Sequence, residues 1–300
     1  MESSIATAKP LSSQVGGHAG VLTTEDGSLI IKPVLPLELQ FYQAVQQDIN
    51  LAPLQPFIPK FLGTLRLEGQ LDEAKSTESG NITLASVEIA PQKDDKPNIL
   101  DVKLGTILYD ESAPPDKVYD NKTSEAVNTP KSYGKSIRPV DLPDGIARFF
   151  PVGGPLTEDG GAVSGASPSG LPLQTLQPIL QGIREEIVEI RDAFSEVEVT
   201  MVGGSLLIVY EADWTRAEAG IQKLLEDDEE LEDGDDEDED DEDEGDEGNK
   251  RLGVPFSVKL IDFAHTRLVP GKGPDQGVLL GINTVLKLID GRISELEKLE

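Results

Sequence analysis

Asp101 and Lys103 stand two positions apart near the end of a short apolar run, Pro97 to Gly105. On a β-strand, side chains two positions apart share one face, so this spacing predicts a carboxylate beside an ammonium group. Such a carboxylate can orient or deprotonate a hydroxyl group, and such an ammonium group can neutralise developing negative charge. Gly105 lets the backbone turn or approach a ligand closely. The same pattern also fits a strand-end salt bridge before a turn, and the motif alone does not decide between the two.

Four further residues have side chains that could take part in the same chemistry. Lys32 ends an apolar strand and can act as a point charge on phosphate oxygens, although a lone lysine there is more often a surface residue. Asp262 is the centre of an Ile-Asp-Phe triplet, which resembles the Asp-Phe-Gly pattern in which a protein kinase holds Mg²⁺. Ser205 follows a Gly-Gly pair and, taken alone, is explained by a strand opened by a tight turn. His265, taken alone, is more simply explained as a structural histidine.

The order of these motifs along the chain resembles the inositol polyphosphate kinase family. The family signature, Pro-x-x-x-Asp-x-Lys-x-Gly, is matched at every fixed position by Pro97 to Gly105. Its Ser-Leu-Leu and Ile-Asp-Phe motifs are matched by Ser205–Leu207 and Ile261–Phe263. Gln14 to His18, followed by Ile30 to Pro33, is similar to the family's N-terminal hairpin. The resemblance spans roughly residues 14–290 and is greatest to fungal inositol polyphosphate multikinases.

The resemblance implies an α+β, two-lobed, kinase-like fold that binds ATP between its lobes. It implies transfer of the γ-phosphoryl group of ATP to hydroxyl groups of inositol polyphosphates, with ATP and Mg²⁺ as cofactors. Lys32 matches the lysine that pairs with ATP phosphates, and Glu88 matches the hinge glutamate whose backbone meets adenine. The usual acidic residue after that glutamate is Ile89 here.

The remaining motif positions match residues around the reacting groups. Asp101 matches the aspartate near the ribose and the substrate hydroxyl, and Lys103 matches the lysine that contacts the transferred phosphoryl group and the substrate. Asp262 matches the Mg²⁺ ligand. Ser205 is expected near the metal and phosphates, and His265 near the substrate. Phosphoryl transfer needs cations for the charge on the equatorial oxygens and alignment of the attacking hydroxyl, so the matched residue types suit the reaction.

The chain departs from the family pattern after Lys117. In the family, a helical segment rich in basic residues and Gln grips the inositol phosphates at this point. Here Val118 follows directly and resembles sequence from beyond that segment, so roughly two dozen residues are absent relative to the family. A natural deletion, an alternative splice and a gene-model error all explain this junction. It places substrate turnover in question, and a catalytically impaired kinase-like scaffold is the alternative function.

Negative charge dominates the composition and is concentrated in one segment. The chain has 300 residues and a net charge of −30, and 19 of the 22 residues from Glu226 to Glu247 are acidic. Such a tract cannot bury apolar surface and is expected to be disordered. It is either a solvated loop or a docking arm for basic proteins in transcriptional regulation. No basic stripe for nucleic acid is present in the sequence.

The composition also bounds the class of protein. The chain contains no Cys, which excludes disulfides and thiolate zinc sites. No apolar run approaches the roughly 20 residues of a bilayer span, and no secretory signal is recognisable. We therefore expect a soluble intracellular protein, located in the nucleus and cytoplasm as the resemblance implies.

Hydrophobic periodicity predicts the elements that position these residues. Residues 1–13 are expected to be disordered, 14–95 to form the N-terminal lobe, and 96–300 the C-terminal lobe with mobile loop 151–172 and disordered insert 226–250. Prolines at 53, 56 and 59 are expected to break any helix. Besides the strand that ends at Gly105, strands are expected at Val21–Ile31 (a hairpin), Phe61–Leu65, Ile82–Ile89, Glu198–Tyr210 and Phe256–Phe263. Helices are expected at Leu37–Asn50, Asp144–Phe150, Leu173–Phe194 and from near Gln276.

Overall fold

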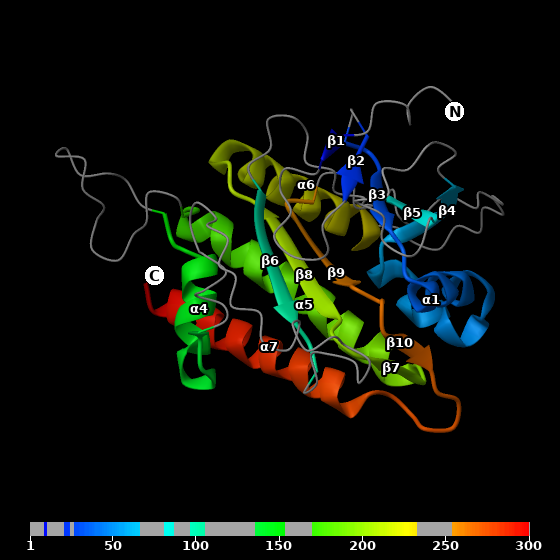
Figure 1. Ribbon diagram of the computed structural model, residues 1–300. Coiled ribbons are helices and arrows are strands. Elements are labelled where there is room, and N and C mark those ends of the chain that lie inside the picture. Colours follow the sequence, from blue (N-terminus) through cyan, green and yellow to red (C-terminus); the bar gives the residue numbers. More distant parts are fainter. Residues whose placement is uncertain are drawn as a thin grey trace.

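The computed structural model describes residues 9–10, 21–24, 27–66, 81–86, 97–105, 136–153, 170–232 and 254–299 (Figure 1). The predictions for Glu88, for residues 14–18, for the Lys117–Val118 junction and for residues 233–250 of the acidic tract lie outside these ranges. The described residues form two antiparallel sheets, a short two-stranded ribbon and a set of helices.

The N-terminal sheet carries Lys32. Its strands are β1 (Lys9–Pro10), β2 (Leu22–Thr23), β3 (Ile30–Pro33), β4 (Lys60–Arg66) and β5 (Asn81–Ser86), in the order β1-β2-β3-β5-β4. The predicted hairpin is confirmed, because Leu22 of β2 pairs with Ile31 of β3. The hydroxyl of Thr24 accepts a hydrogen bond from the backbone N–H of Leu29 at 3.1 Å, which closes the turn. Lys32 lies within β3 rather than after it.

Helix α1 (Pro36–Gln47) follows the sheet, as its apolar spacing predicts. Pro36 occupies the first helical position, where its missing N–H costs nothing. The 3₁₀ helix η2 (Ile49–Phe57) comes next, so the expectation that prolines 53 and 56 exclude any helix is wrong. The fixed φ of proline suits a 3₁₀ turn, whereas it breaks a longer α-helix. The predicted helix extended to Asn50, but α1 ends at Gln47, and Ile49 beyond it is 81% exposed.

α1 and η2 pack against the C-terminal elements. α1 contacts strand β10 (Thr266–Leu268), and η2 contacts α5 (Leu173–Glu196) and β9 (Phe256–Ile261). Their buried side chains belong to one hydrophobic core that continues into the C-terminal half. Packing therefore joins residues 36–57 of the expected N-terminal lobe to the C-terminal body.

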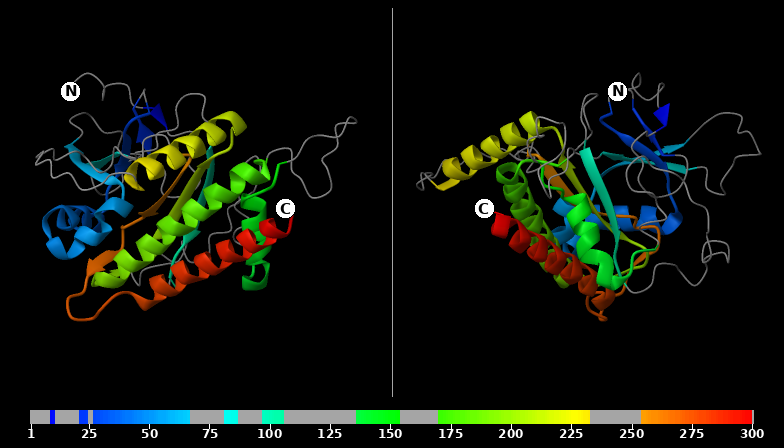
Figure 2. Two further views of the ribbon diagram at one scale, coloured as in Figure 1. Left: turned by 180° about the vertical axis from the view of Figure 1, so that it is seen from behind. Right: turned by 90° about the vertical axis from the view of Figure 1, so that its left-hand side faces the viewer.

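The second sheet consists of β6 (Pro97–Lys103), β8 (Ser205–Glu211) and β9 in the order β6-β8-β9. One face of β8 is buried through Leu206, Ile208 and Tyr210. α5 and α7 (Gln276–Leu296) run across this face and cover it (Figures 1 and 2). Ser205, itself fully buried, begins β8 on the opposite face, which is the face that Asp101 and Lys103 share.

Helix α5 is the predicted long amphipathic helix. Its expected apolar stripe is confirmed, because six side chains at helical spacing are fully buried: Leu176, Ile179, Leu180, Ile183, Ile187 and Ile190. The predicted short helix is also present, as α4 (Leu142–Phe149) after the 3₁₀ turn η3 (Pro139–Asp141). A final 3₁₀ turn, η5 (Glu297–Leu299), follows α7.

Two parts of the C-terminal half differ from the sequence expectation. The predicted strand over residues 198–210 is two strands, β7 (Val199–Met201) and β8, because Gly203 has a φ of 72° and turns the chain between them. β7 pairs with β10 in the two-stranded ribbon. Helix α6 (Trp214–Glu232) runs into the acidic tract, so the expected disordered insert is wrong for residues 226–232. Buried Ala217 and Ile221 anchor this helix, and Glu and Leu sustain it. Within the described ranges, no helix has the length and apolar character needed to cross a bilayer.

Close packing of α5 on the sheet gives a stability prediction. A Cβ on Gly182 of α5 would lie 2.1 Å from the buried ring of Phe256 in β9, so Gly182→Ala requires the ring or the helix to shift. We expect a loss of about 1–3 kcal/mol in the free energy of unfolding, measured by urea denaturation. Gly291→Ala in α7 is the matched control, because a Cβ there meets nothing within 4 Å. An equal effect of the two substitutions would contradict this packing.

Candidate active site

The antiparallel register brings three motifs of the sequence together. Their residues Asp101, Lys103, Ser205 and Asp262 form one group, called the row below. Lys103 of β6 pairs with Ser205 of β8, and Ser205 pairs with Ile261 of β9, the residue before Asp262. The ammonium group of Lys103 donates hydrogen bonds to Ser205 Oγ and to Asp262 Oδ2, both at 2.5 Å. Its Nζ also lies 3.5 Å from Asp101 Oδ2. The ends of three strands thus meet at a single positive charge.

The backbone holds the Lys103 strand end in a fixed place. The N–H of Leu104 donates to the carbonyl oxygen of Gly204 at 2.9 Å, which extends the β6–β8 pairing past Lys103. Gly105 then turns with a φ of 88°. It passes so close to α7 that a Cβ on Gly281 would lie 3.1 Å from the Gly105 backbone nitrogen. Gly105 therefore allows the turn, and the missing Cβ of Gly281 allows α7 to approach it closely.

Asp262 occupies an unusual backbone conformation. Its φ is 67°, and among the described residues other than glycine it alone has a positive φ. An aspartate in this region costs free energy, and such strain is concentrated at functional sites. The next residue, Phe263, is 1% exposed. The chain thus turns sharply between a side chain that faces the row and one that enters the core.

One carboxylate oxygen of Asp101 is available as a hydrogen-bond acceptor for a ligand. Its Oδ1 atom is buried and has no hydrogen-bond partner among the described residues. A buried carboxylate oxygen without a partner is costly, and it is satisfied when a ligand hydroxyl or water donates to it. This atom fits a site that accepts a hydroxyl-bearing substrate.

Lys32 pairs with a residue that the sequence analysis missed. Its ammonium group forms a salt bridge with Glu38 of α1, and Glu38 is only 3% exposed. The ion pair connects the N-terminal sheet with the helix that packs on the C-terminal body. One signal in the sequence could have found Glu38, because it lies on the same helical face as Phe41, Tyr42 and Val45, where a carboxylate is out of place.

Tyr42 lies close to the carboxylates of Glu38 and Asp262. Burial raises the pKa of its hydroxyl far above the ordinary value, and the nearby carboxylates of Glu38 and Asp262 raise it further. The hydroxyl therefore stays neutral and leaves those carboxylates without a competing negative charge. Its electrostatic contact with both places the Lys32–Glu38 pair and Asp262 in one neighbourhood.

The predicted residues fall into distinct groups. Asp101, Lys103, Ser205 and Asp262 are in contact, whereas Lys32 is held by Glu38. His265 lies in the turn between β9 and β10, where its backbone carbonyl accepts the N–H of Val202 at 3.4 Å.

The oxygen atoms in the row suit a magnesium–nucleotide complex. Within the described ranges, no three His, Asp or Glu side chains group as a self-sufficient metal site. Mg²⁺ instead favours one or two carboxylates together with substrate phosphates and water. Asp262 and Ser205 offer a carboxylate and a hydroxyl, and Asp101 Oδ1 is an unused oxygen beside them. These residues therefore fit Mg²⁺ only when phosphates complete its shell.

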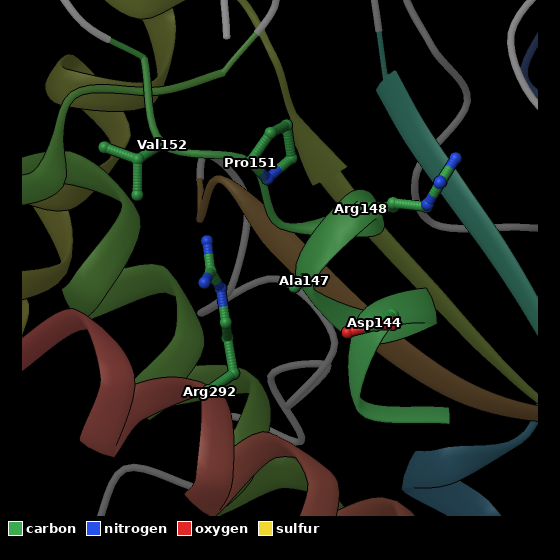
Figure 3. A pocket seen from close by; sticks show the side chains of 6 residues that line it. All are labelled: Asp144, Ala147, Arg148, Pro151, Val152 and Arg292. Carbon is green, nitrogen blue, oxygen red and sulfur yellow. The ribbon is translucent and has the colours of Figure 1, made fainter. Parts of the chain in front are cut away.

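A hollow elsewhere has a structural explanation. It measures about 350 Å³, lies between α4 and α7, and is lined by Asp144, Ala147, Arg148, Pro151, Val152 and Arg292. Arg292 reaches from α7 toward Pro151 and Val152, whereas Arg148 points away (Figure 3). Arg292 donates to the carbonyl oxygen of Phe150 at 2.8 Å, just past the carboxyl end of α4. A cation there stabilises the helix end, so the hollow carries none of the chemistry above.

The backbone of Asp262 gives a prediction that needs no ligand. Asp262→Gly and Asp262→Ala both remove the carboxylate, but only alanine keeps a Cβ at a φ of 67°. We expect the glycine variant to be the more stable of the two by about 1 kcal/mol, measured by urea denaturation. An alanine variant as stable as the glycine variant would contradict the left-handed conformation.

Comparison with known proteins gives the family of this chain. The family model described as inositol polyphosphate kinase matches residues 90–290. The inositol polyphosphate multikinase of Saccharomyces cerevisiae is 31% identical over 363 aligned positions, which cover 93% of this chain and 96% of the yeast protein. The alignment is longer than this chain, so the yeast protein has segments without a counterpart here. The human inositol polyphosphate multikinase is 27% identical, over 67% of this chain and 51% of the human one.

A solved structure shows the same fold. The crystal structure of the inositol phosphate multikinase Ipk2 from S. cerevisiae, in complex with ADP and Mn²⁺, superposes with a TM-score of 0.51 and 25% identity. The superposition covers 88% of this chain and 99% of the yeast chain. Sequence and structure lead to one conclusion: this chain belongs to the inositol polyphosphate kinase family.

Proposed function

We propose that this chain is an ATP- and Mg²⁺-dependent kinase that transfers the γ-phosphoryl group to hydroxyl groups of inositol polyphosphates. The observation that carries the proposal is the row in which the Lys103 ammonium group joins Ser205 and Asp262 beside Asp101. Its support from relatives is the yeast multikinase, which this chain matches over nearly its whole length.

In this proposal, Lys32 and Mg²⁺ provide the positive charge that binds the phosphates of ATP. Lys32 binds phosphate oxygens of ATP, and Glu38 holds the Lys32 side chain in place, as a buried glutamate does in protein kinases. Asp262, with Ser205, holds Mg²⁺. When bound, the metal ion neutralises negative charge on the phosphate oxygens.

Lys103 and Asp101 act at the reacting centre. Lys103 exchanges its bonds to Ser205 and Asp262 for oxygens of the transferred phosphoryl group, where charge grows in the transition state. Asp101 accepts the hydrogen bond of the attacking hydroxyl through its unpartnered Oδ1 and so aligns the nucleophile. His265, two residues beyond Phe263, contacts the inositol phosphate, whose charge calls for a locally basic site within an acidic protein.

Substitution of single residues in the row tests the proposed kinase activity. We expect the purified protein to phosphorylate inositol trisphosphate, and Lys103→Ala or Asp262→Asn to lower kcat by at least about 100-fold. Glu38→Gln should lower kcat/KM for ATP, because Lys32 loses the partner that positions it. Radiolabel transfer from ATP to the inositol phosphate measures all four proteins.

A control separates loss of chemistry from loss of fold. Arg184 forms a surface ion pair with Asp290 at 2.5 Å, on the helices behind the sheet. Arg184→Gln should retain activity within about twofold, because an exposed ion pair contributes little to stability. A folded wild-type protein that binds ADP but transfers no phosphate to inositol polyphosphates would contradict the proposal. It would leave the catalytically impaired scaffold.

The acidic tract carries a separate proposal about partners and location. Its 19 acidic residues suit basic proteins, and we infer that it docks them in the nucleus and cytoplasm. Deleting residues 234–247 leaves helix α6 intact. The deletion should weaken binding of a lysine-rich histone-tail peptide, and binding to the full chain should fall steeply with salt. Fluorescence anisotropy measures both, and unchanged binding after the deletion would refute the docking role.

A further inference from the structure

Four aromatic side chains connect α1 to the turn that carries Asp262. The ring of Phe41 stacks on the ring of Phe263 with centroids 4.5 Å apart and planes inclined by 25°. The ring of Tyr42 meets Phe263 edge-on at 5.6 Å. Tyr42 also stacks on Phe61 of β4 at 5.4 Å. The ring of Phe263 is therefore gripped by two consecutive residues of one helix.

These ring contacts lie next to Asp262, whose backbone is strained. Phe263 is 1% exposed and follows Asp262, whose φ of 67° needs support from its surroundings. The carbonyl oxygen of Phe263 accepts the N–H of Thr266 at 3.0 Å, which fixes the far side of the turn. The ring contacts fix the near side. Loss of the stack would leave the Asp262 carboxylate free to rotate away from Ser205 and Lys103.

The same helix supports the other half of the site. α1 carries Glu38, the partner of Lys32, only three residues before Phe41. Phe41 and Tyr42 are 1% and 2% exposed, so they are locked between the helix and the turn. The position of α1 therefore affects both the Lys32 ammonium group and the Asp262 carboxylate.

We propose that Phe41 and Tyr42 are positioning residues that hold Asp262, through the ring of Phe263, in the geometry that binds the divalent metal ion of the nucleotide. The proposal rests on the proposed function, because it takes Asp262 as the metal ligand. Both aromatic side chains are buried and contact Phe263, so they act on Asp262 through that ring. Their effect is on the metal ion rather than on the nucleotide itself.

A second aromatic cluster supplies the matched control. Phe150 stacks on Tyr210 with centroids 5.2 Å apart and planes inclined by 21°, and it is 0% exposed. This cluster lies beside α4, which is at the opposite end of the molecule from α1 (Figure 1). Phe150→Leu and Phe41→Leu each remove a phenyl ring from a buried stack. The ring of Phe150 lies far from Asp262, whereas the ring of Phe41 stacks on Phe263, the residue after Asp262.

The experiment measures ADP binding by titration calorimetry with and without Mn²⁺. The dissociation constant without Mn²⁺ divided by the dissociation constant with Mn²⁺ gives a ratio that reports how much the metal ion strengthens ADP binding. We expect Phe41→Leu and Tyr42→Leu to lower this ratio by about tenfold or more, because residues that orient a ligand typically change metal affinity by 10–100-fold. ADP binding without metal should change by less than twofold. Phe150→Leu should keep the wild-type ratio, and Tyr42→Phe, which retains the ring, should keep it too.

The outcomes separate the inference from the function on which it rests. A wild-type ratio near one would overturn both. A wild-type ratio well above one that persists in Phe41→Leu and Tyr42→Leu would overturn the inference alone. If Phe41→Leu does not fold by circular dichroism, Tyr42→Leu against Tyr42→Phe decides, because the two differ only in the loss or retention of the ring and share the loss of the hydroxyl. An equal fall in the ratio for Phe150→Leu would show a general loss of stability instead and would also overturn the inference.

Discussion

The ammonium group of Lys103 lies among Asp101, Ser205 and Asp262 and so connects the ends of three strands. Two carboxylates face one another across this charge, at 3.5 Å and 2.5 Å from the nitrogen. Without the cation these two negative charges would repel each other. The row therefore holds its geometry only while a cation occupies its centre. A magnesium–nucleotide complex brings replacement cationic charge when Lys103 turns to phosphate, so the site is arranged to exchange one cation for another.

Helices α5 and α7 support this row from behind, and α1 supports it from one side. The buried face of β8 rests on α5 and α7, which fixes the register that pairs Lys103 with Ser205. α1 approaches from the N-terminal side, with Glu38 bound to Lys32 of β3 and its aromatic residues against Phe263. The helix belongs by sequence to the N-terminal half and by packing to the C-terminal core. The Lys32–Glu38 ion pair and the stack of Tyr42 on Phe61 of β4 thus connect the N-terminal sheet to the body.

Local rules and family resemblance predicted different parts of the site. Strand alternation alone placed Asp101 and Lys103 on one face, because that relation spans two residues. Ser205 and Asp262 reach Lys103 over sequence separations of 102 and 159 positions, and no local pattern encodes such a pairing. Their grouping was expected only because the order of motifs resembled a known family. Glu38 was not predicted, because it lies on a helix rather than at a strand end and belongs to none of the matched motifs.

The fold shows the same division between local and long-range information. The amphipathic spacing of α5 was sufficient to predict its buried stripe. β7 falls within the strand predicted over residues 198–210, but its separation from β8 and its pairing with β10 depend on long-range contacts that no periodicity reveals. The acidic residues after Glu226 looked incompatible with order, yet α6 carries its helix into them from an anchored start.

A crystal structure of the protein with ADP and Mn²⁺ tests the central claim most directly, because anomalous scattering locates the metal ion without assumption. The account predicts a manganese peak at the carboxylate of Asp262, with Ser205 in its shell or bonded to its water. It also predicts that the Lys103 ammonium group has left Asp262 for a phosphate oxygen. A manganese–ADP complex bound away from the row, with Lys103 still joined to Ser205 and Asp262, would contradict it.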